Sequence, residues 1–147
     1  MYKVNKMSTR GLIGIKEGDK YRVIYNHSDS YPEYLGKMLK KHYNTEEKAK
    51  ELVGLGDVSY VAKEIGFKHN FDKAYKEHPD WTLAYGRDRN ETWTKPKEYK
   101  DLNEIYNHAD HDGAEYVYLF RDGKWHSYKV DGKLTPLDKD EKKLVKV

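Results

Sequence analysis

The sequence predicts an α+β fold in which N-terminal and C-terminal hairpins form an antiparallel sheet, with short helices mainly on one face. Alternating apolar residues flank turn-forming clusters near both ends of the chain, which is typical of hairpins. Apolar residues at helical spacing occupy much of the middle. The length of 147 residues corresponds to one domain, 1–147, in which 1–6 are an N-terminal extension and 137–147 a C-terminal segment prone to fraying.

The first hairpin is predicted over residues 11–27. Two apolar runs flank residues 16–20, a cluster of turn-forming residue types. The apolar pattern then changes to a helical period, and a helix is expected to begin at Pro32 or Glu33. Proline is favoured at a first helical position because its missing N–H has no partner there in any case.

Two further helices are predicted before the middle of the chain. One covers residues 46–55, with Asn44 or Thr45 as its N-cap and acidic residues in its first turn. The next covers residues 57–65 and ends at Gly66, a residue type that commonly terminates helices.

The following segment is predicted as loop, strand, turn and helix in that order. Residues 67–80 lack a clear period and are interpreted as loop. Residues 81–85 form a strand that joins the sheet and is followed by a turn over residues 86–90. Residues 98–109 carry apolar side chains at helical spacing, and Gly113 ends that helix.

The second hairpin is the clearest local prediction. Residues 115–121 and 124–130 are joined by Asp122-Gly123, which favours a two-residue type I′ turn. The residue pattern does not show which face of this hairpin is inward. The resulting register places Phe120 opposite Trp125, Tyr118 opposite Ser127 and Tyr116 opposite Lys129.

Composition excludes several classes of protein. The absence of cysteine excludes disulfide scaffolds, thiolate nucleophiles and cysteine zinc sites, and it fits a reducing cytoplasm. No apolar run approaches the roughly 18 residues of a membrane span, so we expect a cytoplasmic protein with no membrane partner. The net charge is +3, with basic and acidic residues dispersed along the chain, which is weak support for nucleic-acid binding.

The first candidate site is the segment Arg87-Asp88-Arg89, which follows Gly86. It holds two of the five arginines in a chain that otherwise uses lysine. Arginine offers a planar fork that matches phosphate or carboxylate, which lysine cannot do. The alternative is an Arg–Asp–Arg ion-pair network that stabilises the turn.

The second candidate site lies where a strand ends and a helix begins. His27 and Asp29 project to the same side if the backbone is extended, which suits an imidazole oriented by a carboxylate or two metal ligands. Tyr31 belongs to the same segment. The alternative is that Asp29 or Ser30 only caps the helix.

The third candidate site is a cluster of potential metal ligands, of which His108, Asp110 and His111 are the candidates. Closely spaced histidine and aspartate side chains are typical of metal sites. The alternative is that the cluster lies at the C-terminus of a helix, where histidine and a following glycine are expected for capping.

Several motifs in a fixed order carry a resemblance to known proteins. They cover most of residues 7–130 and resemble a family of small uncharacterised proteins from bacteriophages and mobile elements. The resemblance implies a phage accessory protein, a class that includes many inhibitors of host defence. Family members carry Trp-Asp-Gly where this chain has Ser28-Asp29-Ser30. The motifs are Ser8-Thr9-Arg10-Gly11-Leu12-Ile13-Gly14, Tyr25-x-His27-x-Asp29-Ser30-Tyr31-Pro32, Leu55-Gly56-Asp57-x-Ser59, Ala84-Tyr85-Gly86-Arg87-Asp88-Arg89-Asn90-Glu91 and Tyr116-Val117-Tyr118-Leu119-Phe120.

We therefore expect a non-enzymatic protein, without a cofactor or a tightly bound metal, that binds an anionic, nucleotide-like signal or a host defence protein. Association with a second copy of the chain, as a homo-oligomer, is a further possible partnership. One alternative is a small metal-assisted hydrolase or nuclease, and another is a sequence-tolerant nucleic-acid binder that stacks bases on the aromatic residues of the second hairpin. The expected ligand-binding residues are Arg87, Arg89, Asp88, Arg10, His27, Asp29 and Tyr31.

Overall fold

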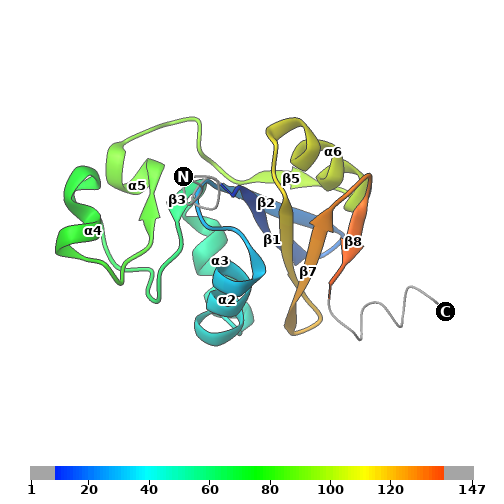
Figure 1. Ribbon diagram of the computed structural model, residues 1–147, viewed down its shortest axis with the longest axis horizontal. Coiled ribbons are helices and arrows are strands. Elements are labelled where there is room, and N and C mark those ends of the chain that lie inside the picture. The colour runs from blue at the N-terminus through cyan, green and yellow to red at the C-terminus, as the bar shows by residue number, and fades with distance from the viewer. Residues whose placement is uncertain (1–8, 138–147) are drawn as a thin grey trace.

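The computed structural model describes residues 9–137 and is built on one mixed sheet. The strand order is β4-β3-β2-β1-β6-β7-β8, and β5 pairs with β2 beside that path. The strands are β1 (Gly11–Glu17), β2 (Lys20–Asn26), β3 (Val58–Tyr60), β4 (Leu83–Ala84), β5 (Lys97–Tyr99), β6 (Tyr116–Arg121), β7 (Lys124–Val130) and β8 (Leu134–Pro136). The helical elements are η1 (Pro32–Gly36), α2 (Lys37–His42), α3 (Glu46–Gly54), η2 (Phe71–Lys73), α4 (Ala74–Glu77), α5 (Tyr85–Arg89) and α6 (Leu102–Asp112) (Figure 1).

The α+β class is confirmed, but the sheet is not purely antiparallel as predicted. Strand β1 pairs in parallel with β6, and β2 pairs in parallel with β3. A parallel pair needs a long crossover connection, which the helices between the two hairpins supply. The hairpins are local features, whereas the way they join depends on the path of the whole chain.

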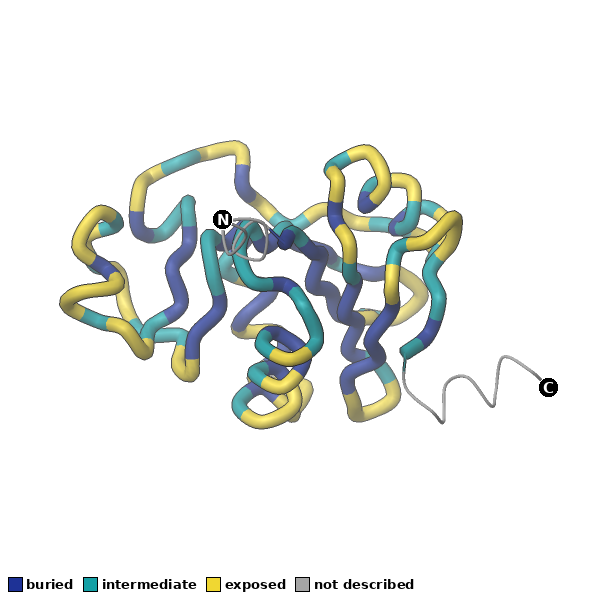
Figure 2. The backbone as a smooth tube through the Cα atoms, viewed as in Figure 1, coloured by how far each residue is buried: buried dark blue, intermediate teal, exposed yellow. Residues whose placement is uncertain are grey.

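Helices cover both faces of the sheet, whereas the sequence predicted them mainly on one. On one face, η1, α2 and α3 contribute Leu35, Leu39 and Leu52 to a large apolar core. On the other face, α6 packs Ile105 and Ala109 against a second core. The central strands are therefore buried on both sides, which Figure 2 shows as dark segments through the middle of the molecule.

The C-terminal hairpin has the predicted register, including Phe120 opposite Trp125. Its turn residues Asp122 and Gly123 both have positive φ, 53° and 80°, as a type I′ turn requires. Both of its faces are buried. Tyr118, Phe120 and Trp125 belong to the core under α2 and α3, and Val117, Leu119 and Tyr128 belong to the core under α6.

The predicted helix boundaries agree with the structure where a capping residue defines them. The Thr45 side chain accepts a hydrogen bond from the Lys48 amide at 3.1 Å and begins α3. Pro32 begins the helical segment η1, as predicted. Gly113, with φ 73°, ends α6.

Several predictions of secondary structure are wrong. The helix predicted over 98–109 begins only at Leu102, and residues 97–99 form strand β5. The segment 67–80, interpreted as loop, contains η2 and α4. Residues 57–65 contain strand β3 rather than a helix, because Val58 pairs with Asn26 on one side and Ala84 on the other. The predicted turn over 86–90 is the short helix α5. Strand β8 was not predicted, and most of the C-terminal segment 137–147 lies outside the described residues.

The loop between β2 and η1 is fixed by a buried network. The Asn26 side chain donates to the Ser30 hydroxyl at 2.8 Å, and the Tyr118 hydroxyl donates to the Ser30 carbonyl at 2.7 Å. Gly11 lies so close that an added Cβ would be 2.7 Å from the Ser30 Cβ. This contact explains why glycine begins β1, and it holds the end of β2 beside the start of β1.

Candidate functional site

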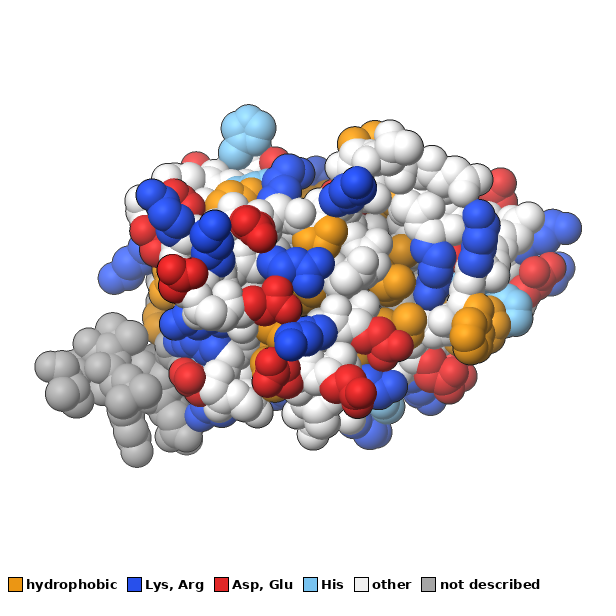
Figure 3. Space-filling model, turned by 180° about the vertical axis from the view of Figure 1, so that it is seen from behind, with side chains coloured by type: hydrophobic (Ala, Val, Ile, Leu, Met, Phe, Trp, Pro, Cys, Tyr) orange, Lys and Arg blue, Asp and Glu red, His pale blue; other side chains and the backbone are white. Residues whose placement is uncertain are grey.

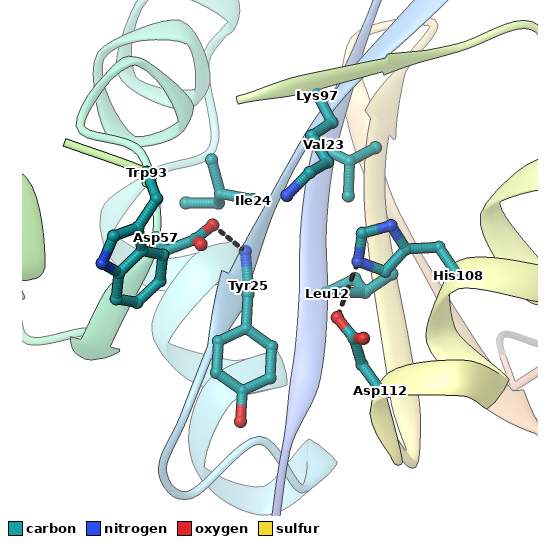
Figure 4. A pocket seen from close by; sticks show the side chains of 9 residues that line it. All are labelled: Leu12, Val23, Ile24, Tyr25, Asp57, Trp93, Lys97, His108 and Asp112. Carbon is teal, nitrogen blue, oxygen red and sulfur yellow. Dashed lines mark hydrogen bonds and ion pairs between the residues drawn. The ribbon is translucent and has the colours of Figure 1, made fainter. Parts of the chain in front are cut away.

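A polar cleft of about 270 Å³ lies on the α6 side of the sheet, between β2, α6 and the chain segment that leads into β5. Leu12 and Val23 form its apolar floor and belong to the core under α6. Figure 4 shows the polar side chains around this floor. They are Tyr25, Asp57, Trp93, Lys97, His108 and Asp112.

Asp57 is held rigidly at one side of the cleft. Its carboxylate accepts a hydrogen bond from the Tyr25 amide at 2.9 Å, and its own amide donates to the Thr94 carbonyl at 2.8 Å. The residue is 7% exposed. Burial raises the pKa of Asp57, while the hydrogen bond from Tyr25 and the charge of Lys97 oppose that rise. The cleft therefore contains a carboxylate in a fixed position.

The opposite wall of the cleft is formed by side chains on α6 and β5 that hydrogen-bond to one another. His108 Nε2 lies 2.7 Å from the Asp112 carboxylate, and His108 Nδ1 contacts the Tyr99 hydroxyl. Burial alone would raise the pKa of Asp112, but the hydrogen bonds and charges of His111 and His108 lower it. Both ring nitrogens of His108 are therefore engaged within the protein.

The three candidate metal ligands on α6 do not form a ligand set. Asp110 is exposed, the His111 side chain is 89% exposed, and only His108 turns toward the cleft. Within residues 9–137, no group of three or more His, Cys, Asp or Glu side chains is arranged to hold a metal ion.

A second polar group, made of His27 and Arg10, lies beyond Tyr25 on the same face of the sheet. The Tyr25 hydroxyl lies 3.0 Å from His27 Nδ1. Burial lowers the pKa of His27, and the nearby charge of Arg10 lowers it further. Burial raises the pKa of Tyr25, and Arg10 opposes that rise. Arg10 and His27 thus lie near each other beyond Tyr25, next to the residues that line the cleft rather than among them.

The charge of Arg10 is not balanced within the described part of the chain. Its guanidinium makes no hydrogen bond or ion pair with any residue of 9–137, and its Nε atom is buried without a partner. A buried, unpaired donor on a cation costs free energy unless a ligand satisfies it. This arginine is therefore the strongest indication of an anion site.

Asp29 and Tyr31 take positions that the sequence did not predict. His27 is oriented by Tyr25 rather than by Asp29, and Asp29 adopts a left-handed conformation with φ 55°. Burial raises the pKa of Asp29. The helix after the loop has no side-chain cap, so Asp29 does not cap it either. Tyr31 lines a different cleft of about 490 Å³, together with Glu33.

Arg87 is engaged inside the protein. Its Nε donates to the Asp88 carboxylate at 2.9 Å, and its terminal nitrogens donate to the carbonyls of Ile65 and Thr82 at 2.8 and 2.7 Å. The Asp88 side chain is fully buried and also accepts from the Ala84 amide at 2.9 Å. This geometry is that of the structural ion pair considered from the sequence.

Arg89 is engaged separately from Arg87. It lies 2.5 Å from the Glu91 carboxylate, and its guanidinium stacks over the rings of Phe71 and Tyr85 at 4.3 and 5.1 Å. The two guanidinium groups are thus bound by different partners, and the structure does not bring them together on one ligand.

Of the polar residues around the cleft, the sequence analysis proposed only His108 as a candidate. It missed Tyr25, Asp57, Trp93, Lys97 and Asp112. Asp57 belongs to one of the family-like motifs but was assigned to the start of a helix. Trp93 is 63% exposed, an unusual position for so large an apolar side chain. An isolated tryptophan in a polar segment was the signal that could have identified it.

The aromatic residues of the C-terminal hairpin do not form a surface for stacking bases. Tyr118, Phe120 and Trp125 are buried, and the Trp125 indole donates to the Tyr43 carbonyl at 2.8 Å. Figure 3 shows basic and acidic side chains interspersed over one face of the molecule. That mixture is unlike the basic stripe that follows a nucleic-acid backbone.

No helix within residues 9–137 has the length and apolar character needed to cross a membrane. Two observations bear on function: the cleft, and the guanidinium of Arg10, whose buried Nε has no partner within residues 9–137. Comparisons of the chain with protein-family models, with curated proteins and with solved structures found no match.

Proposed function

We propose that this protein is a phage-type counter-defence protein that sequesters a small anionic, nucleotide-like ligand in the cleft between β2 and α6, without turnover. The observation that carries the proposal is Arg10, whose guanidinium has no partner within residues 9–137 and lies beside His27 at the end of the cleft. A phosphate group would supply the acceptors that this guanidinium lacks.

The composition of the cleft suits the remainder of such a ligand. Ligand sites are mostly apolar with a few well-placed polar groups, and here Leu12 and Val23 form the floor below a polar rim. Trp93 is 63% exposed at the rim and offers a face on which a base can stack. The volume of about 270 Å³ suits one nucleotide better than a polymer.

The spacing along β2 also suits a nucleotide. Asp57 binds the backbone of Tyr25, and the hydroxyl of the same tyrosine contacts His27, so these two polar groups lie at opposite ends of one side chain. Residues two apart on a strand are separated by about 7 Å, which is comparable with the distance that a ribose spans. A base at Asp57 therefore allows a phosphate at Arg10 and His27.

Binding without turnover is supported by the way His108, the histidine that lines the cleft, is held within the protein. His108 is held by Tyr99 and Asp112, so neither ring nitrogen is available to take a proton from a bound molecule. A general base must reach the proton that it abstracts. The metal-assisted hydrolase remains the alternative that the experiment below distinguishes.

The proposal is tested by calorimetric titration of the protein with AMP, GMP, CMP, UMP and their nucleosides. We expect at least one nucleotide to bind, and Arg10→Ala to weaken its binding by about 10-fold or more, the effect of a lost charged hydrogen bond. The corresponding nucleoside lacks the phosphate, so its weaker binding should not respond to Arg10→Ala. The bound nucleotide should be recovered chemically unchanged.

The matched control is Lys124→Ala, which removes one positive charge from the exposed turn of the C-terminal hairpin. If Arg10→Ala and Lys124→Ala weaken binding equally, the effect is one of net charge and the proposed site is wrong. Failure of every nucleotide to bind would refute the proposed ligand class. Conversion of the nucleotide to a product would favour the hydrolase.

A further inference from the structure

The end of the cleft away from Arg10 presents one hydrogen-bond acceptor and one donor side by side. The Asp57 carboxylate is held by the Tyr25 amide at 2.9 Å and lines the cleft. The Lys97 side chain extends into the same space from β5, as Figure 4 shows. Lys97 is near enough for its charge to oppose the rise in the pKa of Asp57 that burial causes. Trp93 lies beside this pair at the rim.

Purine bases differ in the order of donors and acceptors on the edge that faces such a pair. Guanine presents the O6 acceptor next to the N1–H and N2–H₂ donors, whereas adenine presents the N6–H₂ donor next to the N1 acceptor. A lysine is only a donor, and an ionised aspartate is only an acceptor. Lys97 can therefore donate to O6 of guanine, and Asp57 can accept from the two guanine donors. Adenine would place its N6–H₂ donor against the Lys97 donor and its N1 acceptor against the Asp57 acceptor.

We infer that Asp57 and Lys97 recognise the Watson–Crick edge of guanine, so that the cleft takes guanine nucleotides in preference to adenine nucleotides. This inference rests on the proposed function, because it assumes that a nucleotide occupies the cleft. Stacking on Trp93 tolerates every base, so the discrimination between bases falls on Asp57 and Lys97.

The discrimination should be large because Asp57 is buried and fixed. Adenine would place its N1 acceptor against a carboxylate that is 7% exposed and has no room to turn toward solvent. Sites built to hydrogen-bond one substrate reject an analogue that leaves the polar group unpaired by factors of roughly 10⁴–10⁵. Lys97 is exposed and can adapt to another base. We therefore expect a preference for GMP over AMP that is smaller than those factors but at least about 100-fold.

The inference is tested by titrating the protein with GMP, IMP, AMP and XMP. GMP should bind at least about 100-fold more tightly than AMP. IMP lacks the N2 amine and loses one donor to Asp57, so it should bind about 10-fold more weakly than GMP. Equal binding of GMP and AMP, with Arg10→Ala still weakening both, would leave the proposed function standing and overturn this inference. If none of these four binds but CMP or UMP does, this inference alone fails. If no nucleotide binds at all, the proposed function itself fails.

Asp57→Asn provides a gain-of-function test. The asparagine oxygen still accepts from the Tyr25 amide, while its NH₂ group donates toward the cleft. Xanthine carries a carbonyl at the position of the guanine amine, so the variant should prefer XMP to GMP, the reverse of the parent protein. Asp110→Asn, on the exposed side of α6, removes the same charge and should keep the preference for GMP.

Lys97→Ala keeps the inference testable if Asp57→Asn fails to fold. Lys97 is exposed, so its loss should leave the melting temperature unchanged. Removal of the donor to O6 should reduce the ratio of GMP to AMP affinity by about 10-fold. Retention of the full preference for GMP in either folded variant would overturn the inference.

Discussion

Arg10 and Arg87 differ in whether the described part of the chain supplies a partner for the guanidinium. Arg87 is bound by the fully buried Asp88 carboxylate and by two carbonyl groups. Arg10 has no such partner in the described chain, and its Nε is buried. An ion pair with a fully buried carboxylate is costly to break. The paired arginine therefore stabilises the fold, and the unpaired one is the better ligand residue.

Arg87→Ala should lower the free energy of unfolding by about 3–5 kcal/mol, because it leaves the Asp88 carboxylate buried without its partner. Urea denaturation measures this change. The control is Arg22→Ala, which breaks a half-exposed pair with Glu17 and should cost less than about 1 kcal/mol. Similar losses in the two variants would contradict the structural role of Arg87.

At the scale of the element, helix α6 positions one wall of the cleft. Asp101 caps its N-terminus by accepting from the Glu104 amide at 2.9 Å, and Gly113 ends it in a left-handed conformation. His108 and Asp112, which line the cleft, are one turn apart in the last part of this helix. The two terminal signals set the ends of α6, and the packing of Ile105 and Ala109 on the second core leaves His108 and Asp112 at the cleft.

Asp101→Ala should lower the free energy of unfolding by about 1 kcal/mol, because the Glu104 amide loses its capping acceptor. Asp101→Asn should cost much less, since asparagine caps about as well as aspartate. Thermal unfolding of both variants measures the difference. Asp110→Ala changes an exposed residue of the same helix and should alter stability by less than about 0.5 kcal/mol. A loss as large in Asp101→Asn as in Asp101→Ala would refute the capping role.

At the scale of the whole molecule, stability and ligand binding should respond to pH in opposite directions through His27. Burial and the charge of Arg10 lower the pKa of His27 below 6.5. The folded state thus disfavours the charged imidazole. The stability that the neutral His27 side chain contributes is fully present above pH 6.5. It is lost as the pH falls through 6.5 toward the lowered pKa of His27. The same protonation adds a positive charge beside Arg10.

We therefore expect acidification from about pH 7.5 to about pH 5.5 to lower the free energy of unfolding of the ligand-free parent protein more than it lowers that of the His27→Gln variant. Over the same range, nucleotide binding to the parent protein should strengthen relative to His27→Gln. Calorimetric unfolding and titration of the two proteins measure these differences, in which the titration of the nucleotide itself cancels. The raised pKa values of Asp29 and Asp57 act with the opposite sign, since their protonation stabilises the folded state, and they also cancel in the comparison. Parallel pH profiles of the two proteins would contradict the role of His27.

The candidate site was only partly predictable from the sequence. His27 was proposed with Asp29 because the segment lies where a strand ends and a helix begins, and Arg10 was proposed as a further cation for an anionic ligand. The pairing of β1 with β2 places Arg10 near His27, whereas Asp29 does not contact His27. Asp57 and Lys97 come from segments far apart in the chain. No local pattern relates them, because the cleft exists only once β5 and the start of β3 lie against β2.

The sequence by itself determined both hairpins, the register of the second, the start of α3 and the C-terminal end of α6. These features depend on residues within a few positions of one another, such as the positive-φ turn at Asp122 and Gly123. Only the tertiary structure decided that β1 pairs in parallel with β6, that helices cover both faces, and which arginine is paired. Arg87 meets carbonyl groups 22 and 5 residues away, while the guanidinium of Arg10 meets none within the described chain. Such outcomes depend on contacts between distant segments, which sequence periodicity and capping signals do not encode.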